Sequence, residues 1–154
     1  MHKPLKLKLA SNDDLTIASA LLQDAVVRVG DMAWQPASHR FAMVVNRYIW
    51  EEKRRFGLFK SQKKNQKKGR RVRTGLHFNT ILKAEVTGFD PRNTDAFLSL
   101  LSLTVADETK KTDDTVILNL TFSGGAAIKL VAEYMDGLVS DLGESWEATR
   151  VPEH

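Results

Sequence analysis

The chain has 154 residues, of which 42% are hydrophobic and 27% charged, and it contains no cysteine. This length and composition predict a single globular domain over residues 1–150, and the missing cysteines exclude disulfides and thiolate metal ligands. The net charge of +4 conceals an uneven distribution. Residues 51–74 hold eleven Lys or Arg and two acidic residues, a net of +9, so the rest holds twelve against seventeen, a net of −5.

The N-terminal region alternates apolar and basic residues in the order Leu5, Lys6, Leu7, Lys8 and Leu9. A period of two predicts a strand over residues 4–10, and its lysines are typical of an exposed sheet edge. This stretch lacks the long apolar run of a signal peptide, and no window of the chain is apolar enough to span a membrane. We therefore expect a cytoplasmic protein that does not insert into membranes.

A helix is predicted over residues 12–24, directly after this strand. Ser11 is a suitable N-cap, and two aspartates, Asp13 and Asp14, occupy the first turn, where carboxylates favour the helix dipole. Apolar residues recur at helical spacing at Leu15, Ala18, Leu22 and Ala25, widened by Ile17 and Leu21. This stripe indicates a helix that packs on a sheet.

Two paired strands are predicted over residues 25–34 and 41–50, which are rich in β-branched and aromatic residues and are separated by a proline-containing turn. Their apolar residues point to both faces, which suggests strands covered on both sides. Arg28 and Arg47 interrupt them. Each arginine either faces solvent or pairs with Asp24 or Asp31, and a weaker alternative is a secondary anion site.

Beyond the basic stretch, residues 74–86 predict one strand with a bulge near Asn79, and residues 97–105 predict another. The segments on either side of Gly124 and Gly125 predict a hairpin. A three-residue loop of Ser123, Gly124 and Gly125 pairs Leu120 with Ile128 and Leu118 with Leu130, which places apolar residues on one face. This register requires a left-handed backbone at Gly125.

The chain is predicted to close with a short helix that begins near Asp136 and ends at Gly143. The expected fold class is therefore α+β, with about seven mostly antiparallel strands in a curled or barrel-like arrangement, one helix after the first strand and one at the C-terminus. A pleckstrin-homology-like barrel is the specific fold that this combination favours.

Three stretches carry a resemblance to a known family: LQDAVVRVGDM at 22–32, the strand from Phe41 to Glu51 that ends in NRYIWE, and GGAAIKL with the later DLG. They resemble the alphaproteobacterial family known as domain of unknown function 2948. The resemblance covers most of the chain and implies a bacterial cytoplasmic protein. It implies no activity and no site residues.

Few residues suggest catalysis. Of the four histidines, only His77 lies on a predicted strand, and a single strand histidine is more often packed or solvent-facing than catalytic. No histidine or carboxylate pair has metal-ligand spacing, and Gly124 and Gly125 lack the helix that follows a phosphate-binding loop. No nucleophile, base and orienting group can be named together, so we expect neither an enzyme nor a cofactor nor a metal.

The basic stretch from Lys53 to Arg73 is the clearest candidate for binding, and it is also typical of a solvated, mobile loop over residues 53–72. Its candidate binding residues are Lys53, Arg54, Arg55, Phe56, Phe59, Lys60, Lys63, Lys64, Lys67, Lys68, Arg70, Arg71 and Arg73. We expect a non-enzymatic interaction module that binds another protein. The alternative is an accessory protein that uses this stretch to bind nucleic acid.

Overall fold

The computed structural model describes residues 3–49, 69–106 and 114–147. Within these ranges the chain forms one α-helix, two 3₁₀ turns and nine strands in the sheet order β1-β9-β4-β3-β2-β6-β7-β8-β5, with every pair antiparallel. In chain order the elements are β1 (Lys6–Leu9), α1 (Asn12–Leu21), β2 (Val26–Gln35), η1 (Pro36–Ser38), β3 (Arg40–Tyr48), β4 (Arg70–Phe78), β5 (Ile81–Thr87), β6 (Phe97–Val105), β7 (Val116–Phe122), η2 (Ser123–Gly125), β8 (Ala127–Ala132) and β9 (Gly137–Glu147).

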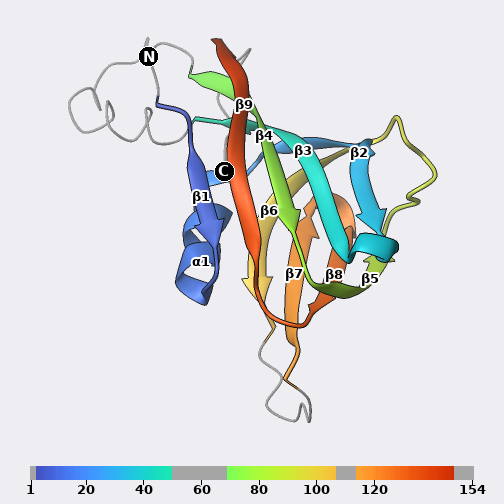
Figure 1. Cartoon of the computed structure of the whole chain (residues 1–154). Coiled ribbons are helices and arrows are strands. Elements are labelled where there is room, and N and C mark those ends of the chain that lie inside the picture. The colour runs from blue at the N-terminus through green and yellow to red at the C-terminus, as the bar shows by residue number, and fades with distance from the viewer. Residues whose placement is uncertain (1–2, 50–68, 107–113, 148–154) are drawn as a thin grey trace.

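The sheet folds into two layers, with β9, β4 and β3 in front of β6, β7 and β8 in Figure 1. The layers are joined because β6 pairs with β2 on one side and with β7 on the other. The core lies between them, where residues such as Leu76, Phe78, Leu100, Phe122 and Leu130 are fully buried. Since β1 and β5 lie at opposite ends of the sheet order, the sheet is curled but does not close into a barrel.

The N-terminal predictions are confirmed in outline. β1 is an edge strand, and Ser11 caps α1 in a capping box, because its Oγ accepts from Asp14 N at 3.2 Å while the Asp14 carboxylate accepts from Ser11 N at 3.1 Å. The helix ends at Leu21, earlier than predicted, and the chain turns at Asp24, which has a left-handed backbone. Leu15 and Leu22 are buried as expected, whereas Ile17 is 51% exposed and does not belong to the packed stripe.

α1 packs against β6 and β1, and its buried side chains enter the core. The expectation that β2 and β3 are covered on both sides is therefore wrong. Figure 1 shows the front of β9, β4 and β3 with none of the described helices or strands over it. This open side of the sheet is important for the site described below.

The β7–β8 hairpin has the predicted register, with Leu118 opposite Leu130 and Leu120 opposite Ile128. Phe122 N donates to Ala126 O at 2.9 Å, which closes the loop around Ser123, Gly124 and Gly125. Gly125 has a φ of +83°, as this loop requires, and Gly124 has a φ of +74°. Face matching between the strands was therefore sufficient to predict the turn.

Replacing Gly125 with valine is expected to lower the free energy of unfolding by about 1–2 kcal/mol, because a β-branched residue is strained in the left-handed region. No atom lies within 4 Å of a Cβ built at this glycine, so the cost comes from the backbone alone. Ser123→Val in the same turn is the control, since Ser123 does not have a positive φ. Equal stability of wild type and Gly125→Val in chemical denaturation would contradict the assigned turn.

Two predictions of secondary structure are wrong. Residues 74–86 do not form one bulged strand, because the chain turns at Asn79 and at Thr80, whose φ is +60°. β4 then pairs with β3 and β9, whereas β5 crosses to the other layer and pairs with β8. Because this segment forms two strands instead of one, the described structure has nine strands, more than the predicted number of about seven.

The predicted C-terminal helix is the second error. The structure has β9 there, and this strand lies between β1 and β4. Its buried positions alternate at Gly137 and Val139, which is a strand period, and the pairing with two neighbours outweighs the helical spacing of Leu138, Val139 and Leu142. The pleckstrin-homology-like barrel, which depended on that helix, is therefore wrong as well.

Candidate functional site

The basic stretch is only partly described by the structure. The predicted binding residues Lys53, Arg54, Arg55, Phe56, Phe59, Lys60, Lys63, Lys64, Lys67 and Lys68 lie outside the described residues. The remaining three, Arg70, Arg71 and Arg73, are on β4. Ile49 N donates to Arg70 O at 2.9 Å, so the chain leaves the described sheet and returns to it at neighbouring points.

Strand register places Arg73 on the open side of the sheet. Arg73 is opposite Asn46 of β3 and Leu142 of β9. The next pair along these strands, Val45 and Thr74, is buried in the core, so the side chain of Arg73 points to the other side of the sheet. On β1, Lys6 and Lys8 face the same side, because Lys6 is opposite Ser140 while Leu5, Leu7 and Leu9 pack into the core. We call this open surface, defined by Lys6, Lys8, Arg73, Leu142 and Trp146, the basic face.

Two large apolar side chains of β9 lie on the basic face. Leu142 is 43% exposed and Trp146 is 39% exposed. Trp146 is opposite Arg71 of β4, and Leu142 is opposite Arg73. The register therefore shifts between these two pairs, because β9 has more residues between them than β4 has. β9 accommodates its extra residues in a bulge at Gly143, whose φ is +71°, and so keeps both side chains on one side.

The basic face carries no acidic residue at any paired position of β1, β9, β4 and β3 in the described chain. Glu144 is exposed in the β9 bulge between Leu142 and Trp146, and further acidic groups act at the two ends of the face. At one end burial lowers the pKa of His77, as does the charge of Arg40, while Asp136 opposes them. At the other end burial lowers the pKa of Arg71 and the negative charge of Asp24 opposes this shift.

Arg71 and Arg70 are partly committed to the protein itself. The Arg71 guanidinium lies 6.0 Å from the centre of the Tyr48 ring and donates to Asn46 O at 3.0 Å. Arg70 donates through Nε to Ser145 Oγ at 2.7 Å and through Nη2 to Ser145 O at 2.8 Å. Lys6, Lys8 and Arg73 are exposed and are therefore the better placed cations for an external ligand.

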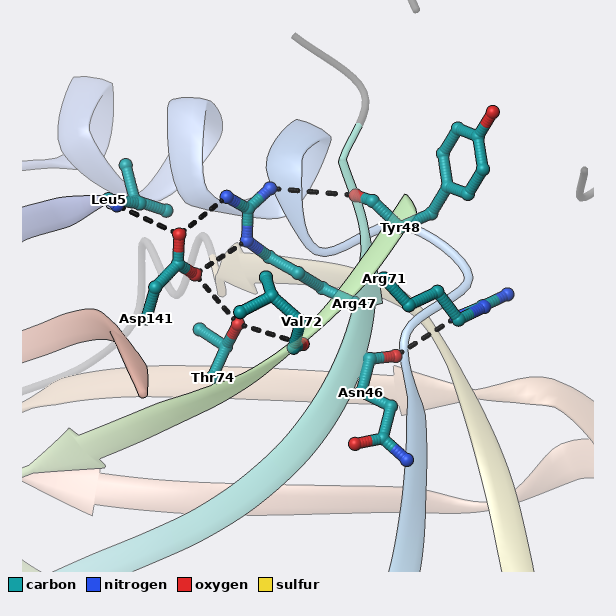
Figure 2. A network of polar contacts seen from close by, with 8 residues as sticks. All are labelled: Leu5, Asn46, Arg47, Tyr48, Arg71, Val72, Thr74 and Asp141. Carbon is teal, nitrogen blue, oxygen red and sulfur yellow. Dashed lines mark hydrogen bonds and ion pairs between the residues drawn. The ribbon is translucent and has the colours of Figure 1, made fainter. Parts of the chain in front are cut away.

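Arg47 lies on the opposite side of β3, inside the core, where it forms an ion pair with Asp141. Figure 2 shows the pair as bidentate, with Nε bound to Oδ1 and Nη2 to Oδ2, each at 2.8 Å. Asp141 also accepts from Thr74 Oγ1 at 2.9 Å and from Leu5 N at 2.8 Å, so its two oxygens contact β1, β3 and β4. Both charged side chains are fully buried, and the arrangement is a structural link between four strands.

The pKa of Asp141 reflects this environment. Burial alone raises it, but the hydrogen bonds from Arg47, Leu5 and Thr74 and the charge of Arg47 outweigh burial and lower the pKa from 3.8 to about 2. The carboxylate is therefore ionised and already bound. The Arg47 guanidinium is held by this carboxylate in the interior, and no anion-binding function is assigned to it.

Arg28 forms an ion pair with Asp31 at 3.1 Å, as one of the alternatives predicted, and a second one with Asp95 at 3.5 Å. The partner of Arg47 was not among those considered, because Asp141 was assigned to a helix. A signal was present in the sequence: Val139 and Asp141 alternate with Leu138, Ser140 and Leu142, which is a strand pattern with one inward carboxylate. Trp146 lies beyond Gly143, where the predicted helix ended, and was not included in any predicted element.

Among the described residues no group of three His, Asp or Glu side chains could hold a metal ion. The same residues contain no helix that is long and apolar enough to cross a membrane. Asp13 and Asp14 lie in the first turn of α1, as predicted. The chemistry available on the open surface is therefore positive charge next to exposed apolar rings and chains.

Comparison with known proteins places the chain in a family. The family model described as "Protein of unknown function (DUF2948)" matches residues 5–154, nearly the whole chain. The protein belongs to this family, as the resemblance in its sequence indicated. No curated protein and no solved structure matches it.

Proposed function

We propose that this protein is a non-enzymatic binding module whose basic face holds single-stranded nucleic acid. The observation that carries the proposal is the strand register, which brings Lys6, Lys8 and Arg73 together with Trp146 on one open side of the sheet. Proteins that bind single strands combine cations for the phosphates with aromatic rings on which bases stack. An open sheet face with both features, and without opposing carboxylates at its paired positions, fits that chemistry.

The charge of the basic face supports one of the two functions predicted from the sequence. A protein partner remains a prediction, and it would have to be acidic to occupy this face. Single-stranded nucleic acid supplies evenly spaced negative charges and flat bases, which match the cations and the exposed Trp146 together. Phosphate contacts and base stacking do not read base identity, so we expect binding with little sequence preference.

Ionic strength provides a quantitative expectation. Three phosphate contacts on a single strand give a slope of about −2 for log K against log salt. Eight further Lys or Arg residues occur in the sequence between Ile49 and Arg70. A slope steeper than about −2 would mean that cations beyond those of the basic face also contact phosphates.

The test is fluorescence anisotropy of a labelled oligothymidine titrated with the full chain at low salt. Trp146→Ala is expected to weaken binding about tenfold, because stacking on one ring contributes about 1–3 kcal/mol per base. Arg73→Ser should weaken binding and reduce the magnitude of the salt slope by about 0.7. Lys129→Ser, which removes one charge from β8 in the other layer, is the control and should change little.

Three results would contradict the proposal. The first is the absence of binding at low salt. The second is an effect of Lys129→Ser equal to that of Arg73→Ser, which would show attraction by net charge alone. The third is unchanged binding in Trp146→Ala, and competition by an acidic peptide that displaces the oligonucleotide would then favour a protein partner.

A further inference from the structure

β5 is an edge strand with an unusually accessible free side. It lies at the end of the sheet order, and in the part of the chain that the structure describes its only strand partner is β8. The other side is occupied at one end, where Ile81 N donates to His39 O at 2.8 Å and the His39 ring lies 3.2 Å from Ile81 O. Among the described residues no backbone hydrogen bond to this free side is seen further along, from Leu82 to Thr87.

The two edges of the sheet differ in how they are protected. β1 has four residues, two of which are lysines, and short, lysine-bearing edges resist pairing with another chain. β5 has seven residues with a register shift against β8 between Ile81 and Lys83, and its regular part from Lys83 to Thr87 carries two charges that cancel and an apolar residue, Val86, that is 39% exposed. A strand of this kind is suited to pair with a further strand.

The charges of β5 indicate which strand that is. Lys83 and Glu85 lie on the same side of the strand, where Lys83 Nζ is 2.8 Å from Glu85 Oε1, and both side chains are substantially exposed, by 65% and 41%. Ala84, between them, faces the core. On one side of Ala84 the sequence continues with Lys83 and Leu82, and on the other side with Glu85 and Val86. Each side therefore has one charged and then one apolar residue, and the two charges have opposite signs.

We propose that two copies of this chain join through β5, antiparallel and about a two-fold axis at Ala84. This register sets Lys83 opposite the partner's Glu85 and Glu85 opposite the partner's Lys83, within the part of β5 that pairs regularly with β8. An axis at Lys83 would set Lys83 opposite the partner's Lys83, and an axis at Glu85 would set Glu85 opposite the partner's Glu85. Like charges opposite one another are destabilising. Self-complementarity about one axis is what a symmetric dimer requires.

The contact joins the sheets of two copies into one continuous sheet. Because the paired segment is short and covers less than the roughly 1,200 Å² typical of stable complexes, the dimer forms and dissociates rapidly and depends on concentration. The residues that define the basic face are on β1, β4 and β9, none of which pairs with β5 in the described structure, so the pairing of two β5 strands does not use them. The inference does not depend on nucleic-acid binding.

Charge reversal tests the register. In sedimentation velocity over a range of concentrations without nucleic acid, wild type should show a monomer–dimer equilibrium. Lys83→Glu alone and Glu85→Lys alone should each dimerise at least about tenfold more weakly, because each creates two like-charge pairs. An equimolar mixture of the two variants should dimerise again, since every facing pair is then opposite in sign, and Lys83→Glu/Glu85→Lys in one chain should match wild type.

Lys8→Glu, the same change on the opposite edge strand, is the control and should leave dimerisation unchanged. Circular dichroism of each variant verifies that it is folded. A wild-type protein that stays monomeric at the highest concentration overturns the proposal. So does a dimer that survives both single reversals, or a mixture of the two variants that does not associate.

Discussion

Replacing Asp141 with asparagine is expected to lower the free energy of unfolding by about 3–5 kcal/mol, because the change removes the buried carboxylate that forms a bidentate ion pair with the Arg47 guanidinium. Arg47 and Asp141 are both 0% exposed, so water cannot replace the lost partner. Asparagine also presents one amide nitrogen where the carboxylate accepted hydrogen bonds from Arg47, Thr74 and Leu5. Urea denaturation at neutral pH measures the loss.

Arg28→Ala is the matched control, since it breaks an ion pair whose side chains are 40% and 32% exposed and should cost about 1 kcal/mol or less. The pH dependence adds a second check. The folded pKa of Asp141 is about 2 against 3.8 unperturbed, so the stability gained from its ionised form is complete above about 4 and is lost as pH falls towards 2. The difference between wild type and Asp141→Asn should shrink over that range. A difference that stays constant with pH would contradict the ionised state assigned to Asp141.

Leu22→Ala should destabilise the protein by about 2–5 kcal/mol, since Leu22 is fully buried and its truncation leaves a cavity in a packed core. Leu22 follows the last residue of α1, its N–H donates to Ala18 O at 2.9 Å, and its side chain belongs to the hydrophobic core. The same leucine was expected from sequence to anchor the helix. Thermal unfolding followed by circular dichroism measures the effect.

Ile17→Ala provides the comparison within the same helix. Ile17 is 51% exposed, so its truncation should cost well under half of the Leu22 effect. Equal losses at the two positions would mean that α1 packs with a different face than the structure indicates. A negligible loss at Leu22 would mean that the helix contributes little to the core.

Local signals predicted the parts of this fold whose partners are close in sequence. The capping box at Ser11 and the β7–β8 turn at Gly125 each involve residues within a few positions of one another. The errors occurred where distant segments decide the outcome. β9 is a strand because β1 and β4 lie on its two sides, and the 74–86 segment divides at Thr80 because its halves pair in different layers.

The candidate site followed the same division. Arg70, Arg71 and Arg73 were selected from composition, and the structure places them on one strand. Lys6, Lys8, Leu142 and Trp146 were not associated with them, because only strand pairing across more than 60 residues brings β1, β4 and β9 together. Asp141 was missed because its segment was predicted to be a helix, so its inward position on a strand was not recognised.

The hydrogen bonds between Asp141 and Leu5 also constrain the order in which the chain can fold during synthesis. β1 pairs only with β9 among the described strands, and the backbone of Leu5 exchanges hydrogen bonds with Asp141, 136 residues away. Among the described strands, β1 is therefore synthesised well before β9, the strand with which it pairs. Such long-range closure slows folding, and the short, lysine-bearing β1 is well suited to wait in solution without aggregating.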